Sequence, residues 1–304
     1  MSKEQLKTEK QDILVGSSKI NSGDKKFDRI KYFENNMQYN KAYLSYLEKN
    51  NAQDLNGKIL HKFIEDYKNY RDEWTNPISR KNNNKPLSID IETASICDLA
   101  CPHCSREYII TPDKVMNEEL YQKLIEETVN IGVPSIKLNW RGEPLLNPKI
   151  CDFIKYAKKN KILEVIINTN ATQLDEKTSK NLIESGLDQI IFSFDGGTEK
   201  TYNAMRPGRF RKNTFDQVYN NIKKFDEMKK KLKSPFPTTK IQMVLTEDTR
   251  GEIESFYNLF NDIVDDVTVI QYNERGGAIK SLKDSNQKKL KDFIGSDKMA
   301  EDTP

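Results

Sequence analysis

The stretch "LEVIINTNATQLDEKTSKNLIESGLDQIIFSF", residues 163–194, places two apolar, β-branched runs on either side of a segment with helical spacing. The runs "LEVIINT" and "QIIFSF" are typical of buried strands, and "DEKTSKNLIESG" is typical of an amphipathic helix that ends at a glycine. A strand, a helix and a second strand in this order predict a right-handed βαβ unit, in which the two strands are parallel.

The same alternation continues on both sides of this unit. The predicted strands cover residues 87–92, 135–140, 163–169, 189–194, 240–245 and 267–272, and the predicted helices cover 117–132, 148–160, 175–186, 215–232 and 251–264. A closed eight-stranded barrel needs about 250 residues, whereas this part of the chain supplies six strands. The sequence therefore predicts an α/β fold whose parallel sheet is open or only partly closed.

The rest of the chain differs in composition. Residues 1–26 are polar and lack apolar periodicity, so we expect disorder there. Residues 27–85 have apolar and aromatic residues at helical spacing, followed by the polar stretch "SRKNNNKP", and predict a helical extension and a linker. We expect this extension to pack against the core at 86–272, and residues 273–304 to form a polar tail.

Composition and charge exclude some classes of partner. The chain has 304 residues, with 49 Lys and Arg against 46 Asp and Glu, and its formal charge of +3 is not the excess typical of nucleic-acid binding. No run approaches the roughly 18 apolar residues of a membrane span. We expect a cytoplasmic protein with neither a nucleic-acid nor a membrane partner. Thiols stay reduced there, so clustered cysteines indicate metal or redox chemistry.

Polar loops follow four successive predicted strands. They are "CDLACPHC" at 97–104, "WRGEPLLNP" at 140–148, "NTNAT" at 168–172 and "SFDGGT" at 193–198. In parallel α/β folds the carboxyl ends of the strands lie on one rim, where the chemistry gathers. The four loops therefore predict a single site.

The first loop has the spacing C-x3-C-x2-C, with Cys97, Cys101 and Cys104. Three thiolates can hold three irons of an iron-sulfur cluster and leave one iron open to a ligand. Zinc would need a fourth ligand such as His103 or Cys151, but Cys151 fits a small buried residue of a helix. The spacing favours a cluster, with zinc and a metal-free loop as alternatives.

The other three loops supply candidate ligand contacts. A glycine allows close backbone approach, a carboxylate accepts from an ammonium group, and short polar side chains bind hydroxyls or carboxylates, although the same residues also form ordinary turns and strand ends. The candidates are Gly142, Glu143, Asn168, Asn170, Ser193 and Asp195.

The motifs "CDLACPHC", "RGEP", "NTNAT" and "SFDGGTEKTYNAMRPG", in this order, resemble those of the radical S-adenosylmethionine (radical SAM) enzymes. The likeness covers about residues 86–272 and is strongest to the branch that often carries a C-terminal SPASM domain for auxiliary clusters. It implies a partial (β/α)6 barrel with a 4Fe-4S cluster on the three cysteines. The fourth iron would bind S-adenosylmethionine, whose reductive cleavage gives a 5'-deoxyadenosyl radical that abstracts hydrogen from a substrate.

The resemblance also implies roles for single residues. Gly142 and Glu143 match the motif that binds the methionine amino group, with Arg141 where many members have another glycine. His103 would be a wall of the site near the adenine and not a ligand. The positions that match contacts to the ribose or the methionine carboxylate are Asn168, Asn170, Ser193 and Asp195.

The partners follow from the same resemblance. The substrate would be a peptide or protein side chain, or a sugar or nucleotide-sugar, and the electron would come from an external donor such as flavodoxin or ferredoxin. No cysteine follows Cys151, so either no auxiliary cluster is needed or the chain is a fragment. Two alternatives are a non-catalytic binding module stapled by zinc or a cluster, and a redox switch of vicinal thiols.

Overall fold

The computed structural model describes residues 27–76, 85–108 and 112–272. The predicted disorder at 1–26, most of the linker and the polar tail at 273–304 lie outside the described residues.

The centre of the molecule is a parallel sheet of six strands in chain order. The strands are β1 (Ser88–Asp90), β2 (Ser135–Lys137), β3 (Glu164–Thr169), β4 (Gln189–Ser193), β5 (Thr238–Leu245) and β6 (Asp266–Gln271). Each strand pairs with the next along the chain, from β1 with β2 to β5 with β6. The sheet is therefore open between its two edge strands, as the strand count predicted.

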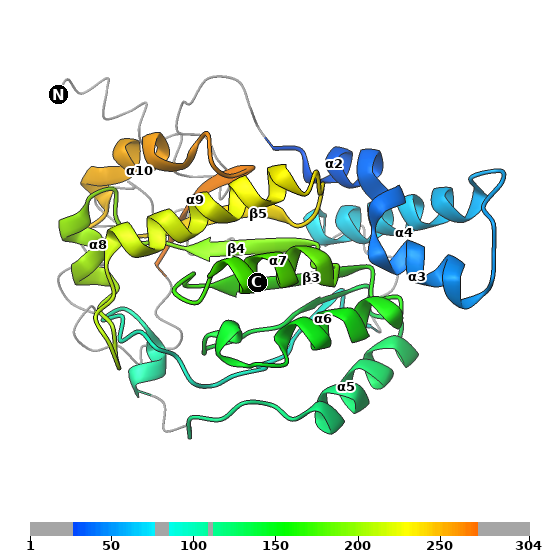
Figure 1. The fold of residues 1–304 in the computed structure, drawn as a ribbon, viewed down its shortest axis with the longest axis horizontal. Coiled ribbons are helices and arrows are strands. Elements are labelled where there is room, and N and C mark those ends of the chain that lie inside the picture. The colour runs from blue at the N-terminus through cyan, green and yellow to red at the C-terminus, as the bar shows by residue number, and fades with distance from the viewer. Residues whose placement is uncertain (1–26, 77–84, 109–111, 273–304) are drawn as a thin grey trace.

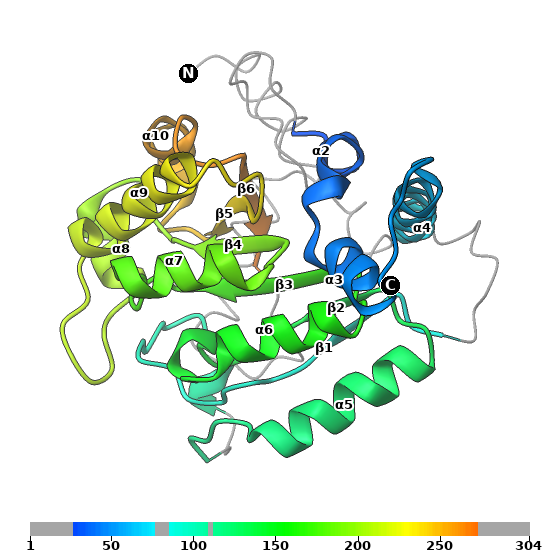
Figure 2. The ribbon, with the colours of Figure 1, turned by 45° about the vertical axis from the view of Figure 1, so that its right-hand side comes forward.

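Helices follow the strands and cover one face of the sheet (Figures 1 and 2). They are α5 (Glu118–Asn130), α6 (Ile150–Lys159), α7 (Glu176–Ser185), α8 (Glu199–Met205), α9 (Phe215–Lys231) and α10 (Ile253–Phe260). The sequence predicted all of these except the short α8. The Asn117 side chain caps α5 by accepting from the Leu120 N–H, and Gly132 lies just beyond its end at a positive φ of 73°.

The main hydrophobic core lies between the sheet and these helices. Ile136, Ile167 and Ile190, from three neighbouring strands, are fully buried. The ring of Tyr121 on α5 stacks on that of Phe153 on α6, with centroids 3.9 Å apart. Each such side chain stabilises the fold by roughly 1.5–3 kcal/mol relative to an exposed one, so this core fixes the strands that carry the loops.

The helical extension packs against the amino-terminal ends of the strands, on the right of Figure 1. It consists of α2 (Arg29–Asn36), a short 3-10 turn, α3 (Lys41–Lys49) and α4 (Lys58–Thr75). A second hydrophobic cluster joins it to the residues around the strand starts, and its buried members are Phe33, Met37, Tyr67, Tyr70, Leu87, Leu163 and Phe236. The extension thus lies at the end of the sheet opposite the polar loops.

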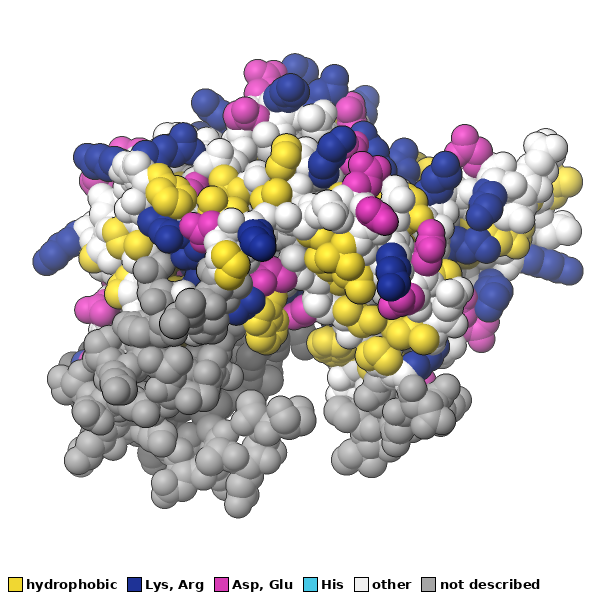
Figure 3. All heavy atoms as spheres, turned by 90° about the horizontal axis from the view of Figure 1, so that it is seen from below, with side chains coloured by type: hydrophobic (Ala, Val, Ile, Leu, Met, Phe, Trp, Pro, Cys, Tyr) yellow, Lys and Arg dark blue, Asp and Glu magenta, His cyan; other side chains and the backbone are white. Residues whose placement is uncertain are grey.

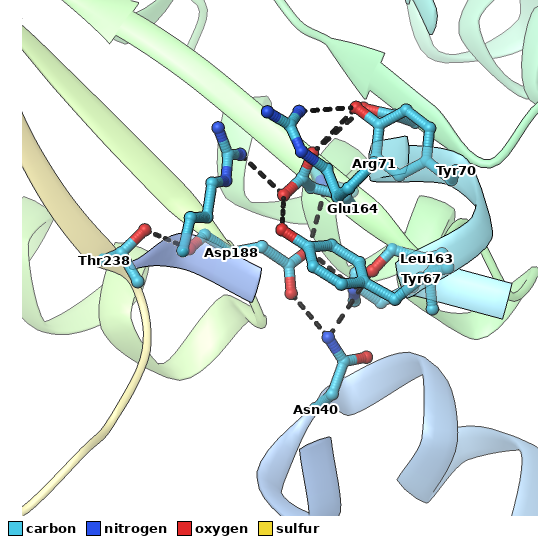
Figure 4. A network of polar contacts seen from close by, with 12 residues as sticks. Asn40, Tyr67, Tyr70, Arg71, Leu163, Glu164, Asp188 and Thr238 are labelled. Atoms are coloured by element: carbon cyan, nitrogen blue, oxygen red, sulfur yellow. Dashed lines mark hydrogen bonds and ion pairs between the residues drawn. The ribbon is translucent and has the colours of Figure 1, made fainter. Parts of the chain in front are cut away.

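Buried polar contacts reinforce this junction (Figure 4). The Glu164 carboxylate, at the start of β3, receives the Arg29 guanidinium at 2.6 Å and the hydroxyls of Tyr67 and Tyr70 at 3.0 and 3.1 Å. Burial alone would raise the pKa of Glu164, but the positive charge of Arg29 and the Tyr67 hydrogen bond hold it below its usual value. The carboxylate therefore stays ionised and links the extension to the sheet.

The surface carries both charge signs. The face seen in Figure 3 shows Lys and Arg interspersed with Asp and Glu, with hydrophobic side chains between them. Within the described residues, no helix is both long enough and apolar enough to span a bilayer.

Candidate functional site

A pocket of about 270 Å³ lies at the carboxyl-terminal ends of the strands. Loops that follow the first four strands line it, together with residues of β5 and β6. The predicted site residues that line it are Cys97, Cys101, Cys104, Gly142, Glu143, Asn168, Asn170 and Ser193. His103 also lines it, whereas Asp195 and Cys151 do not.

The backbone of the cysteine loop is held on two sides. On one side the Glu143 N–H donates to the Ile96 carbonyl at 2.8 Å. On the other side the Ala100 N–H donates to the Pro207 carbonyl at 2.9 Å, and Leu99 forms an antiparallel bridge with Gly208. The loop is therefore fixed by the fold itself.

The sequence predicted that Gly142 allows the backbone to approach a ligand closely. In the structure, Gly142 lies close to another segment of the protein backbone. A β-carbon at this position would lie 2.1 Å from the Ala94 carbonyl oxygen and 2.7 Å from that of Ile96. The glycine is thus required by contact with the protein backbone that leads into the cysteine loop, and it also lines the pocket.

Two of the three thiols are strongly desolvated. Burial, together with the negative charge of Glu143, raises the pKa of Cys97 to about 12. Burial also raises the pKa of Cys101 to about 12, against the lowering effect of Arg206. Both are protonated near neutral pH until a metal replaces the proton, because a metal binds the thiolate.

The geometry bears on the choice of metal. Among the described residues, no three His, Cys, Asp or Glu side chains gather closely enough to hold a single metal ion. A cluster places its thiolates on different irons, so its ligands need not converge on one point. Cys151, one proposed fourth zinc ligand, lies on α6 against the main core. The pocket thus gathers three thiols, those of Cys97, Cys101 and Cys104, which is the number of protein ligands that a 4Fe-4S cluster with one open iron would take.

Glu143 joins the second loop to the third. Its Oε1 accepts from the Thr169 hydroxyl at 2.7 Å, and its Oε2 accepts from the Asn170 N–H at 2.8 Å. Burial raises the pKa of Glu143 to about 7, although these hydrogen bonds oppose the rise. The carboxylate therefore holds two loops of the pocket wall together, and it is also a candidate contact to the cofactor.

Asp98, which sequence reasoning missed, joins the first loop to the third. This buried carboxylate accepts from Asn170 Nδ2 at 2.7 Å, the Thr172 hydroxyl at 2.6 Å and Gln173 Nε2 at 2.8 Å. It lies between two of the cysteines in sequence, but its partners are more than 70 residues away. No short-range pattern reveals such a contact.

Asn168 differs from the other polar residues of the third loop. Its backbone N–H donates to Asn139 Oδ1 at 2.8 Å. Its side-chain Oδ1 is buried and has no hydrogen-bond partner within the described residues. A buried acceptor without a partner is costly, so this oxygen is suited to a ligand that donates a hydrogen bond.

Asp195 was predicted as a cofactor contact, and the structure places it behind the pocket wall instead. Its carboxylate is fully buried and accepts from Arg206 at 2.6 and 2.7 Å and from the Val244 N–H at 2.7 Å. His103 Nε2 lies 3.1 Å from it. The alternation of Ser193 and Asp195 with apolar residues predicted which side of the sheet the two side chains face. It did not predict that Asp195 is buried behind the pocket wall. Asp195 instead orients two pocket-lining side chains, of which Arg206 was not predicted.

Three cations line the pocket, and each has a carboxylate partner. Lys137 lies 3.4 Å from Asp90, and Arg206 lies 2.6 Å from Asp195. Arg141, which stands where the motif often has glycine, binds Glu92 through Nε at 3.0 Å and Nη2 at 2.7 Å. The positive charge contributed by these three side chains is thus compensated within the protein.

Comparison with known proteins agrees with this geometry. Residues 91–260, more than half of the chain, match the family described as the Radical SAM superfamily. The chain belongs to the radical SAM superfamily. Members of this superfamily use a 4Fe-4S cluster and S-adenosylmethionine, so the three thiols of the pocket have the expected chemistry.

Two curated relatives carry related names. "GTP 3',8-cyclase" of Chlorobaculum tepidum is 29% identical over 173 residues, which are 56% of this chain and 49% of the relative. "Probable GTP 3',8-cyclase" of Methanothermobacter marburgensis is 30% identical over 122 residues, 40% of this chain and 39% of the relative. The chain thus spans less than half the length of these radical SAM relatives.

A solved structure supports the fold. SuiB of Streptococcus suis, determined with S-adenosylmethionine and with the precursor peptide SuiA, matches with a TM-score of 0.54 at 18% identity. The match covers 82% of this chain and 54% of SuiB. The partial (β/α)6 barrel predicted from the sequence is therefore confirmed as the radical SAM fold.

Proposed function

We propose that this chain is the catalytic core of a radical SAM enzyme, in which Cys97, Cys101 and Cys104 hold a 4Fe-4S cluster. The observation that carries the proposal is the single pocket that gathers these thiols with candidate contacts from three further strand ends. The bound cluster and S-adenosylmethionine supply reductive cleavage of a carbon–sulfur bond and hydrogen abstraction from the substrate.

The residues of this chain then bind and orient the cofactors. Asn168 offers its buried side-chain oxygen, and Ser193 offers a hydroxyl at the end of β4. Gly142 and Glu143 hold the second loop against the cysteine loop and the third loop. His103 forms part of the wall and is anchored by Asp195. No general acid or base is needed for this first step.

For the substrate, we propose a peptide or protein side chain, or a sugar or nucleotide-sugar. The fold neighbour SuiB was solved with a precursor peptide. In addition, Lys137, Arg141 and Arg206 already face carboxylates, so a triphosphate, like the diphosphate of a nucleotide-sugar, would compete with a carboxylate for each cation. GTP, named in the two relatives, is therefore the informative comparison in a substrate screen.

The electron is proposed to come from an external donor of the flavodoxin or ferredoxin type in the cytoplasm. Cys97, Cys101 and Cys104 are free thiols in the structure, and a reducing compartment such as the cytoplasm keeps thiols available to bind iron.

The decisive experiment is anaerobic reconstitution with iron and sulfide, reduction with dithionite in the presence of S-adenosylmethionine, and detection of 5'-deoxyadenosine. We expect product from the wild type, none from Cys101→Ala, and the wild-type amount from Cys151→Ala, the matched control on α6. A protein that instead holds zinc with a fourth protein ligand and has no affinity for S-adenosylmethionine would be a binding module, and the enzyme proposal would fail.

A further inference from the structure

The side-chain amide of Asn170 has a fixed orientation. Its Oδ1 accepts from the backbone N–H of Thr172 at 3.0 Å. A backbone N–H can only donate, and the ionised Asp98 carboxylate at the other end can only accept, so these two contacts settle which end of the amide is which. The Nδ2 group must therefore face the other way, into the cysteine loop.

The Nδ2 group meets two acceptors there. It lies 2.7 Å from Asp98 Oδ1 and 3.8 Å from the sulfur of Cys97. An amide nitrogen carries two hydrogens, and these two contacts use both. Because the Asn170 oxygen is also satisfied and the side chain is buried, this residue has no polar side-chain atom left for the nucleoside or methionine part of a cofactor.

We propose that Asn170 is a positioning residue for the iron-sulfur cluster, whose amide N–H donates to the Cys97 sulfur and raises the reduction potential of the cluster. This inference rests on the proposed function, in which Cys97 is a cluster ligand. It replaces the expectation that the Asn170 side chain contacts the ribose or the methionine carboxylate.

The physical reason is the charge of the reduced cluster. Reduction adds one electron, supplied by the external donor, and the added negative charge spreads onto the thiolate sulfurs. A hydrogen bond to a sulfur stabilises this more negative state and so favours reduction. The effect is enhanced here because Cys97 is partly buried, which lowers the local dielectric around its sulfur.

Asp98 is the partner that holds the donor in place. Its carboxylate binds Asn170 on Oδ1 and Thr172 and Gln173 on Oδ2. Gln173 contacts the same carboxylate, and no described contact links its side chain to a cysteine sulfur. A change at Gln173 therefore disturbs the network without removing the N–H donor, and it provides a matched control for a change at Asn170.

The test is an anaerobic redox titration of the reconstituted full chain, followed by electron paramagnetic resonance of the reduced cluster. The variants are Asn170→Leu, which is close in size but has no donor, Asn170→Ala as a second variant in case the first does not fold, and Gln173→Leu. Iron and sulfide contents are measured in each sample before titration.

We expect the Asn170 variants to keep the wild-type iron content but to show a more negative midpoint potential, with a two- to five-fold smaller equilibrium constant for reduction. Gln173→Leu should keep the wild-type potential. An unchanged potential in the Asn170 variants, or an equal shift in Gln173→Leu, would overturn the inference while leaving the proposed function intact. A wild-type chain that assembles no cluster would remove the proposed function, and the inference with it.

Discussion

The backbone of Gly142 passes so close to Ala94 that a β-carbon at position 142 would lie 2.1 Å from the Ala94 carbonyl oxygen. The contact joins the loop after β2 to the segment that leads into the cysteine loop. The obstructing atoms are backbone atoms, so a side-chain rotation cannot relieve the clash.

We predict that Gly142→Ala separates these two segments and destabilises the metal-free protein by about 2 kcal/mol. Urea unfolding measures the loss, and reconstitution should also give a lower iron content. Gly251→Ala is the control, because a β-carbon at Gly251 meets nothing within 4 Å. Equal stability of the two variants would show that the loops are not held together in this way.

Glu143→Ala should keep the iron but weaken the binding of S-adenosylmethionine by about tenfold, since the change removes a candidate cofactor contact and the hydrogen bonds that hold the third loop to the pocket wall. Anaerobic calorimetry of the reconstituted protein measures the affinity. Glu254→Ala, at an exposed position on α10, controls for loss of a carboxylate. An unchanged affinity in Glu143→Ala would remove this residue from the cofactor site.

Asn168→Ala tests the buried oxygen that has no partner in the described structure. Its removal breaks no described side-chain hydrogen bond within the protein, so we expect the melting temperature and the iron content to stay at the wild-type values. The affinity for S-adenosylmethionine should fall about five-fold, the equivalent of one hydrogen bond. Asn181→Ala on the exposed side of α7 serves as control. A large loss of stability without a change in affinity would contradict the assignment.

The pH dependence of folding should report on Glu164. Its pKa is lower in the folded protein than in the unfolded chain, so the stability that it contributes is complete above its ordinary value of about 4.5 and is lost as the pH falls through the folded pKa. We predict that Glu164→Gln makes unfolding less dependent on pH below 5, and costs about 3 kcal/mol at pH 7 because Arg29 loses its buried partner.

Glu65→Gln on the exposed side of α4 is the matched control for this change. Chemical denaturation of the metal-free protein at several pH values measures both effects. A Glu164→Gln protein with the wild-type pH profile would mean that the carboxylate is not held ionised by the extension.

Much of the fold was predictable because its signals are local. β-branched runs marked the strands, Asn117 and Gly132 marked the ends of α5, and the strand count gave the open sheet. The short α8 was missed because its seven residues lie inside a motif and carry little periodicity. Helix α6 begins at Ile150, two residues after the predicted opening at Pro148.

The residues on the rim of the site were predictable from the sequence, but the hydrogen bonds and ion pairs that hold them in place were not. The order of strands and loops placed the cysteines, Gly142 and Ser193 on one rim, and all of them line the pocket. The contacts of Asp98 join segments more than 70 residues apart, and the ion pair of Arg206 with Asp195 reaches across the unpredicted helix α8, so spacing along the chain reveals neither. The depth of Asp195 was missed for the same reason.

The hydrogen bonds that Asp98 and Glu143 form between loops have a consequence for the evolution and engineering of this site. Each side chain satisfies donors from a loop other than its own, so a transplanted cysteine loop without a carboxylate at position 98 would leave Thr172 and Gln173 without their acceptor. The loops therefore form one module, in which a change to one has to be accompanied by compensating changes in its neighbours.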